Sequence, residues 1–397
     1  MPWKEHGVME ERLRFVEEWN SGDWNMAELC RYYGVTRATG YKWVGRYEAG
    51  GVEGLRDLSR AAHAHPNTVS EEMEERVIGM RGKHPSWGAP KIRARMILDG
   101  GDPGIPAEST IGAILKRNGL TVPRKRRRSS RPGGQPLAYT GGANATWCAD
   151  YKGWFRTGDG RIVYPLTITD AYSRYLLRCQ GLPAADYLHS KPVFEAAFRE
   201  YGLPEKLRTD NGAPFGSNGE SGLTGLSVWL IKLGIAPEHI QPGKPQQNGR
   251  HERMHRTLKQ ETAQPPASNR RAQQARFDQF REEYNQERPH EALGQQTPTS
   301  HYRASERSYP GRPRAVEYPA DWNTRRVSCG GQMRWSGENV FVAHALEGEA
   351  VGLEQIDDRN WRVWFSFYEI GVLDSKKLRI RRPEPKLPKE GEDALRG

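Results

Sequence analysis

Three acidic residues stand where carboxylates from distant parts of the chain can meet. Asp150 lies within the β-rich segment WCADYKG, Asp210 directly precedes an Asn-Gly turn, and Glu252 lies at the start of a helical run that follows QPGKPQQNG. A carboxylate inside a strand, one at a strand end and one at a helix start can converge at one edge of a sheet. These contexts therefore predict a cluster of carboxylates and not three isolated surface charges.

Such a cluster is suited to chemistry on phosphodiesters. Two divalent metal ions about 3.5–4 Å apart can hold the attacking and leaving oxygens in line. Hard ions such as Mg²⁺ or Mn²⁺ prefer carboxylate oxygens and leave positions open for phosphate and water. On a helix, Arg256 and Lys259 share a face with Glu252, so they can hold neighbouring phosphates. We therefore expect two Mg²⁺ or Mn²⁺ ions as cofactors.

The overall charge favours a polyanionic partner. The 397-residue chain has 60 Lys and Arg residues against 49 Asp and Glu residues, a net charge of +11. Each cation that neutralises a phosphate releases condensed counterions, which favours binding to a nucleic acid. The same balance is also found in soluble basic proteins with no such partner, so charge by itself leaves both interpretations open.

The cysteines and the apolar segments indicate a cellular compartment. Cys30, Cys148, Cys179 and Cys329 are far apart and form no CxxC pair, as expected for a reducing environment. No apolar run approaches the length of a membrane span, and the first residues lack the apolar core of a signal peptide. We expect a cytoplasmic protein that does not contact membranes.

The first 58 residues predict a helix-turn-helix domain. Gly34-Val35 forms a tight turn, and Thr36 is placed to cap the helix that follows. A short helix, a glycine turn and a cationic helix match helix-turn-helix spacing, although Gly40 inside the last helix costs about 1 kcal/mol of helix propensity. The predicted helices are Met9–Asn20, Met26–Tyr33 and residues 36–47, and the expected DNA-binding residues are Arg37, Thr39, Lys42 and Arg46.

A second helical unit and a basic linker follow. Residues 59–122 predict further helices, capped by Ser70 and Ser109, which form another helix-turn-helix or a simple packing unit. Residues 123–142 are rich in Arg, Lys, Pro and Gly and have almost no apolar side chains, so they cannot bury a core. This linker either tracks a DNA backbone or is a solvated tether. Its cations are Arg124, Lys125, Arg126, Arg127 and Arg128.

The remainder of the chain changes first to strands. Residues 143–302 contain β-rich runs and then strands alternating with helices, which indicates an α/β domain with a mixed sheet. Residues 303–397 begin with a connecting segment and continue as short strands, which fit a small all-β barrel. The predicted fold is therefore multidomain, with an all-α N-terminal part, an α/β core and a C-terminal all-β barrel.

Several segments together resemble the integrase core of retroviral-integrase-like DDE transposases of bacterial insertion sequences, and ELCRYYGVTRATGYKWVGRY resembles the helix-turn-helix of that group. The resemblance implies a ribonuclease-H-like core in which Asp150, Asp210 and Glu252 are the catalytic metal ligands. The interval between the second and third acids is longer than is usual in that family. The segments that carry the resemblance are WCADYKGWF, TITDAYSRY, LRTDNGAPF, QPGKPQQNGRHERMHRTLKQE and YNQERPHEALGQQTP.

The resemblance implies a bacterial, nucleoid-associated transposase that binds terminal inverted repeats and joins them to target DNA. Handling two DNA ends requires at least a dimer. Three other functions stay open: a DNA-binding regulator derived from a transposase, a nuclease that cuts without joining, and a zinc protease, because HERMH matches H-E-x-x-H through His251 and His255. Asp170 competes with Asp150 for the first acid, but we expect it to hold the turn that follows it.

Overall fold

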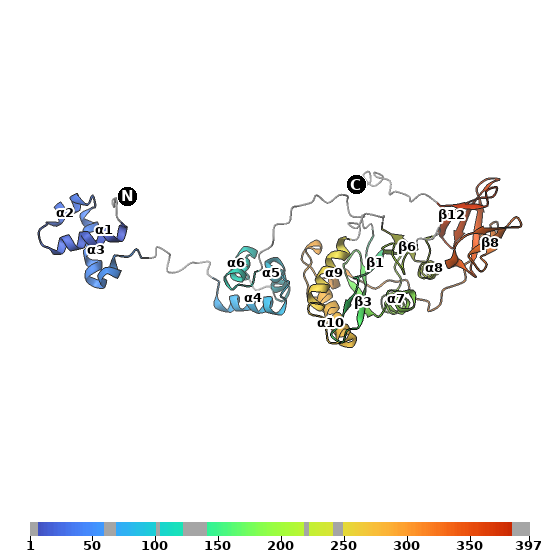
Figure 1. Ribbon diagram of the computed structural model, residues 1–397, viewed down its shortest axis with the longest axis horizontal. Coiled ribbons are helices and arrows are strands. Elements are labelled where there is room, and N and C mark those ends of the chain that lie inside the picture. Colours follow the sequence, from blue (N-terminus) through green and yellow to red (C-terminus); the bar gives the residue numbers. More distant parts are fainter. Residues whose placement is uncertain are drawn as a thin grey trace. The chain divides into compact units, whose positions relative to one another are not determined.

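The computed structural model describes residues 7–58, 69–100, 104–121, 141–217, 222–240 and 249–382. The chain divides into two compact units, Met1–Val69 and Ser70–Gly397 (Figure 1). The five linker cations Arg124, Lys125, Arg126, Arg127 and Arg128 lie outside the described residues. In the described part of the chain, no helix has both the length and the apolar composition needed to span a bilayer.

The first unit is helical, as the sequence predicts. Asn25 caps the second helix by accepting from the Glu28 amide at 2.9 Å, and Thr36 caps the third by accepting from the Thr39 amide at 3.3 Å. The helices enclose an apolar core that includes Phe15. The elements of residues 7–58 are α1 (Val8–Asn20), α2 (Met26–Tyr32), α3 (Arg37–Gly50) and the 3₁₀ turn η1 (Gly51–Leu55).

Gly40 lets α3 approach the other two helices closely. A Cβ at this position would lie 2.6 Å from Cys30 Sγ, 2.7 Å from Met26 Sδ and 2.9 Å from Phe15 Cζ. The helix-propensity cost that the sequence suggested is therefore offset by tight packing of three helices. This packing explains why a glycine occupies a helix interior.

We expect Gly40→Ala to lower the unfolding free energy of the first unit by about 1–3 kcal/mol, because the added methyl group overpacks a filled core. Gly45→Ala is the matched control, since a Cβ at Gly45 on the same helix meets nothing within 4 Å. That control should raise stability by about 0.5–1 kcal/mol. Thermal melts of both full-length variants measure the difference, and equal stabilisation by the two alanines would contradict the packing argument.

Three more helices form the second helical unit, residues 69–121. Ser70 caps α4 by accepting from the Met73 amide at 3.3 Å, as predicted. Ser109 does not cap its helix: Ala107 is the last residue in an extended conformation, so the helix begins at Glu108 and Ser109 lies in its first turn. The described helices are α4 (Glu71–Lys83), α5 (Ala89–Leu98) and α6 (Glu108–Arg117).

The core domain is built on a mixed sheet, which confirms the α/β prediction. Strands pair in the order β4-β3-β1-β5-β6, with the short β2 also on β3. Pairs on the β4 side are antiparallel, and β1-β5 and β5-β6 are parallel. The strands are β1 (Thr146–Tyr151), β2 (Phe155–Arg156), β3 (Ile162–Asp170), β4 (Leu176–Leu182), β5 (Lys206–Thr209) and β6 (Ala236–His239).

Helices cover both faces of this sheet. Trp147 and Ala149 of β1 join the apolar cluster that includes Phe194 and Leu230 from one helix pair. A second cluster joins strand residues to the other helix pair through side chains such as Leu258. The first pair is α7 (Tyr187–Tyr201) and α8 (Gly225–Lys232), and the second is α9 (Gly249–Thr262) and α10 (Arg270–Glu282). Because side chains alternate along a strand, Asp150 points toward the α9 side.

Asn285 closes the outer edge of β4. It lies in a π-helical turn, Glu283–Glu287, within the YNQERPH segment. Its side chain accepts from the Leu176 amide at 2.8 Å and donates to the Leu176 carbonyl at 3.0 Å. The amide group thus replaces the neighbouring strand that β4 lacks among the described strands.

We expect Asn285→Ala to destabilise the core by about 2 kcal/mol or more, because it leaves two buried backbone groups without hydrogen bonds. The exposed neighbour Gln286 provides the matched control, and Gln286→Ala should change stability little. Urea unfolding followed by circular dichroism compares them. If the two variants unfold at the same urea concentration, the strand-edge role of Asn285 is wrong.

The C-terminal domain is all-β, as predicted. A five-stranded antiparallel sheet, in the order β13-β12-β11-β10-β7, and the hairpin β8-β9 enclose one apolar core. Trp335 is buried in this core, so it has a packing role. The strands are β7 (Asn323–Arg326), β8 (Gln332–Trp335), β9 (Glu338–Phe341), β10 (Ala350–Gln355), β11 (Asn360–Phe365), β12 (Tyr368–Asp374) and β13 (Arg379–Arg381).

Candidate active site

Asp150 and Asp210 lie side by side at one edge of the sheet. Strands β1 and β5 are parallel, and Cys148 pairs with Arg208. Asp150 and Asp210 each lie two residues further along, so they are level with each other on strands about 4.8 Å apart. Asp210 also accepts from the Gly212 amide at 3.3 Å, which holds its carboxylate at the turn. The first two predicted acids therefore meet.

Glu252 lies on the accessible face of helix α9. The inward face of the helix buries Met254 and Leu258, whereas Glu252, Arg256 and Lys259 are exposed on the outward side. The structure thus gives these three side chains a common accessible face, as their spacing suggested. An accessible carboxylate flanked by cations can approach both a metal ion and a DNA backbone.

The electrostatics of Asp150 show that the three acids interact. Burial, the charge of Asp210 and, to a smaller extent, the charge of Glu252 together raise the pKa of Asp150 to about 7. Lys152 lowers this pKa, and its cationic side chain close to the acids was not identified from the sequence. The charges of Asp210 and Glu252 are therefore close enough to Asp150 to act on its ionisation.

The two histidines of HERMH face the sheet behind this cluster. Both are almost fully buried, and the Nε2 atom of each lies 2.6 Å from the hydroxyl of Thr167. His251 Nδ1 also lies 3.2 Å from the Thr169 hydroxyl, and His255 Nδ1 lies 3.6 Å from Asp150 Oδ2. Burial holds the pKa of both imidazoles well below the usual value, so both are neutral. Their i,i+4 spacing could be predicted from the sequence, but this contact with Asp150 could not.

Asp170 belongs to the turn after β3 and not to the acid cluster. It is fully buried and accepts from the Asn144 amide at 2.8 Å, from the Ser173 amide at 2.7 Å and from the Ser173 hydroxyl at 2.6 Å. These bonds satisfy a carboxylate that connects the start of β1 to the turn. The expectation that Asp170 holds this turn is confirmed.

The predicted DNA-binding residues of α3 differ in their surroundings. Arg37 and Lys42 are exposed, whereas the Thr39 hydroxyl lies 2.9 Å from the Thr36 hydroxyl in the cap. Arg46 is half-buried, with its guanidinium 4.7 Å from the Trp43 ring and donating to the Arg56 carbonyl. Arg37 and Lys42 are therefore accessible to a ligand, with the Lys42 ammonium 5.0 Å from the Trp43 ring, while Arg46 ties the end of α3 to the following turn.

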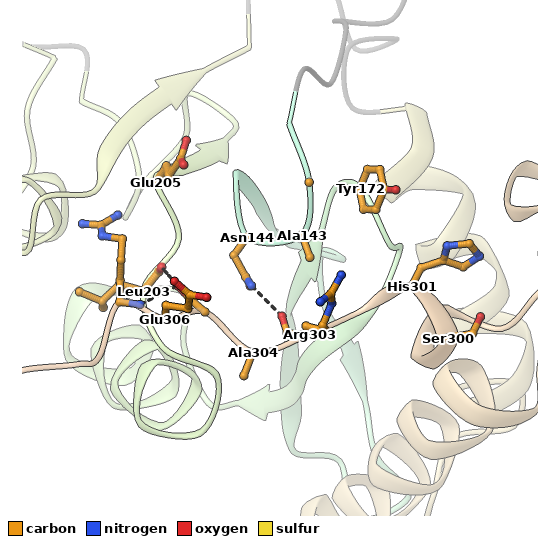
Figure 2. Close-up of a pocket in the computed structure, with 13 residues that line it drawn as sticks. Ala143, Asn144, Tyr172, Leu203, Glu205, Ser300, His301, Arg303, Ala304 and Glu306 are labelled. Atoms are coloured by element: carbon orange, nitrogen blue, oxygen red, sulfur yellow. Dashed lines mark hydrogen bonds between the residues drawn. The ribbon is translucent and has the colours of Figure 1, made fainter.

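A separate cavity of about 590 Å³ lies at the opposite end of β1. Figure 2 shows it between the residues before β1 and the segment around Arg303, where the Asn144 side-chain amide donates to the Arg303 carbonyl at 2.7 Å. None of the predicted catalytic acids lines it. This cavity is therefore separate from the candidate active site.

Family models match successive parts of the chain. Residues 142–245 and 233–298 match two models of an integrase core domain. Residues 11–63 match a helix-turn-helix domain, and residues 39–115 match a homeodomain-like domain. Residues 322–381 match the C-terminal domain of IS481 family transposases. The three parts of the predicted architecture therefore each have a match of the expected kind.

Two individual relatives are insertion-element proteins. An insertion element IS407 protein of Burkholderia multivorans is 26% identical over 66% of this chain and 93% of its own. An insertion element IS476 protein of Xanthomonas euvesicatoria is 28% identical over 62% of this chain and 69% of its own.

Among solved structures, the HTLV-2 integrase catalytic core with magnesium covers 43% of this chain and 100% of its own (15% identity, TM-score 0.33). A simian T-cell lymphotropic virus intasome covers 74% of this chain and 97% of its own (14% identity, TM-score 0.36). The integrase-core matches, the transposase C-terminal match and the insertion-element relatives together support one conclusion: the chain is an integrase-like DNA transposase of the type that bacterial insertion sequences encode.

Proposed function

We propose that this transposase cuts and joins DNA at the carboxylate cluster, with Asp150, Asp210 and Glu252 as the DDE catalytic residues. Two observations support this proposal: Asp150 and Asp210 are level on adjacent parallel strands, and the charges of Asp210 and Glu252 both act on Asp150. Divalent metal ions are general to integrase-like cores. Which ions bind and how many is part of the proposal.

The donor set fits hard divalent cations. Three carboxylates offer only oxygen ligands, which Mg²⁺ and Mn²⁺ prefer. Mutual repulsion and burial raise the pKa of Asp150 to about 7, so the cluster carries unfavourable charge that a cation would neutralise. When two such ions are bound, they supply activation of the attacking hydroxyl and neutralisation of charge on the phosphodiester.

Side chains on the rim position the DNA. Arg256 and Lys259 project from the accessible face of α9 beside Glu252, so they hold phosphates on either side of the scissile bond. The hydrogen bond from the Gly212 amide keeps the Asp210 carboxylate directed at the site. These contacts place the scissile phosphate over the acids and leave the attacking oxygen to approach from solvent.

The helix-turn-helix unit selects the DNA. Arg37, Thr39 and Lys42 read base edges of the terminal inverted repeats, because the start of a recognition helix enters the major groove. Arg46 and the linker cations Arg124, Lys125, Arg126, Arg127 and Arg128 contact the DNA backbone. Since two element ends are joined to one target, the chain acts as a dimer or a larger assembly in the bacterial nucleoid.

A labelled duplex that carries the element's terminal repeat tests this function. Purified chain with Mg²⁺ should release a 3′-hydroxyl end and join it to a second DNA, and a chelator should abolish both products. Cleavage without joining would identify a nuclease. Binding without metal-dependent cleavage would identify a DNA-binding regulator, and a zinc-dependent peptidase activity lost on mutation of His251 and His255 would identify a protease.

A further inference from the structure

The buried histidines of HERMH are not used by the proposed DNA chemistry, yet they adjoin it. His251 and His255 lie one turn apart on the inward face of α9, and Asp150 lies opposite them on β1. One ligand atom from each of the three residues lies within 4.8 Å of the others. Two imidazoles and one carboxylate form a donor set of a different class from the three carboxylates.

The hydrogen bonds of Thr167 assign the proton on each imidazole. The Thr167 hydroxyl donates to the Asp150 backbone carbonyl at 3.2 Å. A hydroxyl has one proton and two lone pairs, so when it donates to this carbonyl it accepts from the Nε2–H groups of both His251 and His255. Each imidazole therefore carries its lone pair on Nδ1. The Nδ1 of His255 faces the carboxylate oxygen Oδ2 of Asp150 at 3.6 Å.

This arrangement has the features of a metal site with oriented ligands. A ligating histidine commonly donates its other ring N–H to an oxygen that fixes the ring orientation, and Thr167 provides that oxygen for both rings. His251 Nδ1 has only a neutral partner, the Thr169 hydroxyl, which a metal ion can displace. Imidazole nitrogens with one carboxylate favour Zn²⁺ and its neighbours over Mg²⁺.

We propose that Asp150, His251 and His255 form a second metal site, selective for Zn²⁺-like ions. Its ion lies between α9 and the sheet, behind the surface at which DNA is cut. Because Asp150 belongs to both donor sets, a zinc ion held here withdraws that carboxylate from the magnesium ions. Zinc therefore inhibits DNA cleavage and joining. This consequence rests on the proposed function, whereas zinc binding itself does not.

Zinc affinity of the full chain tests the site. Metal-free protein is titrated with Zn²⁺ against a chromophoric chelator, for the native sequence and for single variants. His251→Gln, His255→Gln and Asp150→Asn should each weaken zinc binding by roughly 100-fold or more, since each removes a direct ligand. Asp210→Asn and Glu252→Gln should leave it unchanged. His189→Gln is the matched control. His189 also contacts a carboxylate, that of Asp186 at 2.8 Å, but it is not part of the proposed site.

Two outcomes overturn the proposal. If Asp210→Asn and Glu252→Gln weaken zinc binding as much as the histidine variants do, zinc occupies the carboxylate cluster. If no histidine variant changes the affinity, these imidazoles are not ligands. If the buried histidine variants fold poorly, one equivalent of Cu²⁺ bound to the native chain gives an independent measurement. Its electron paramagnetic resonance spectrum should show couplings to nitrogen. A spectrum without nitrogen couplings would contradict the proposed site.

Failure of this proposal is distinguishable from failure of the proposed function. Loss of zinc affinity in His255→Gln, with full Mg²⁺-dependent activity in Asp210→Asn, would leave the zinc site standing and remove the DDE assignment. If instead Asp210→Asn is inactive and the histidine variants bind zinc as tightly as the native chain, the DDE assignment stands and the zinc site is wrong. Addition of Zn²⁺ to the native chain in the presence of Mg²⁺ should reduce strand joining, and unchanged joining at saturating zinc would contradict the inhibition.

Discussion

Asp210→Asn is expected to bind terminal-repeat DNA normally but to lose strand cleavage and joining by roughly 10³-fold or more. The amide keeps the size of the side chain and its contact with the Gly212 turn, but it removes a negatively charged metal ligand. Metal ions supply several kcal/mol of transition-state stabilisation in this kind of chemistry, and about 4 kcal/mol corresponds to 10³ in rate. Asp150→Asn and Glu252→Gln should behave in the same way.

Binding and chemistry must be measured separately for this comparison. Band-shift titration gives the affinity for the duplex, and single-turnover cleavage of the same labelled DNA gives the rate. Glu261→Gln is the matched control. Glu261 lies on α9 with Glu252, but its carboxylate pairs with the Arg288 guanidinium at a distance of 2.9 Å and is not one of the three acids. Activity near the native level in Asp210→Asn, or an equal loss in Glu261→Gln, would remove the case for these three acids.

The double variant Arg37→Ala/Lys42→Ala should lose roughly 100-fold or more in affinity for the terminal repeat. Both side chains are exposed on α3, and each base-specific contact contributes about 1–3 kcal/mol of discrimination. Contacts to phosphate would instead weaken all sequences alike and lower the salt dependence of binding. Affinity for the terminal repeat and for a scrambled duplex, each measured over a range of salt, separates the two kinds of contact.

Arg14→Ala is the control for this loss of charge. Arg14 is half-exposed on α1, and its guanidinium lies 3.9 Å from Glu10 in an exposed pair that contributes little stability. Its removal should leave the preference for the terminal repeat intact. Should the double variant keep that preference, residues outside α3 read the sequence, and the assignment of this recognition helix is wrong.

Local signals in the sequence predicted much of the fold. Thr36 and Ser70 cap helices where their types and positions suggested, because capping depends on a few neighbouring residues. The change from strands to strands alternating with helices predicted the mixed sheet, and the short strands after residue 322 predicted the all-β domain. The local settings predicted for the three acids also hold: Asp150 lies in a strand, Asp210 directly follows one, and Glu252 lies in the first turn of a helix.

Contacts between distant segments could not be read in the same way. The Asn285 side chain hydrogen-bonds the backbone of Leu176 in β4, more than one hundred residues earlier in the chain. Nothing near Asn285 in the sequence indicates this partner. The i,i+4 spacing of His251 and His255 predicted a shared helix face but not that Thr167 and Asp150 face it. Likewise the contacts of Arg46 with Trp43 and with the Arg56 carbonyl depend on how α3 ends, so they could not be predicted from its position in the helix.

Counting bound manganese ions tests the central claim most directly, namely that three distant carboxylates form one site for two divalent ions. Electron paramagnetic resonance of Mn²⁺ titrated into the full chain gives both the number of ions and any magnetic coupling between them. We predict two Mn²⁺ ions per chain, coupled because they share ligands, with binding weakened in Asp150→Asn, Asp210→Asn and Glu252→Gln. Native manganese binding in all three variants would contradict the account.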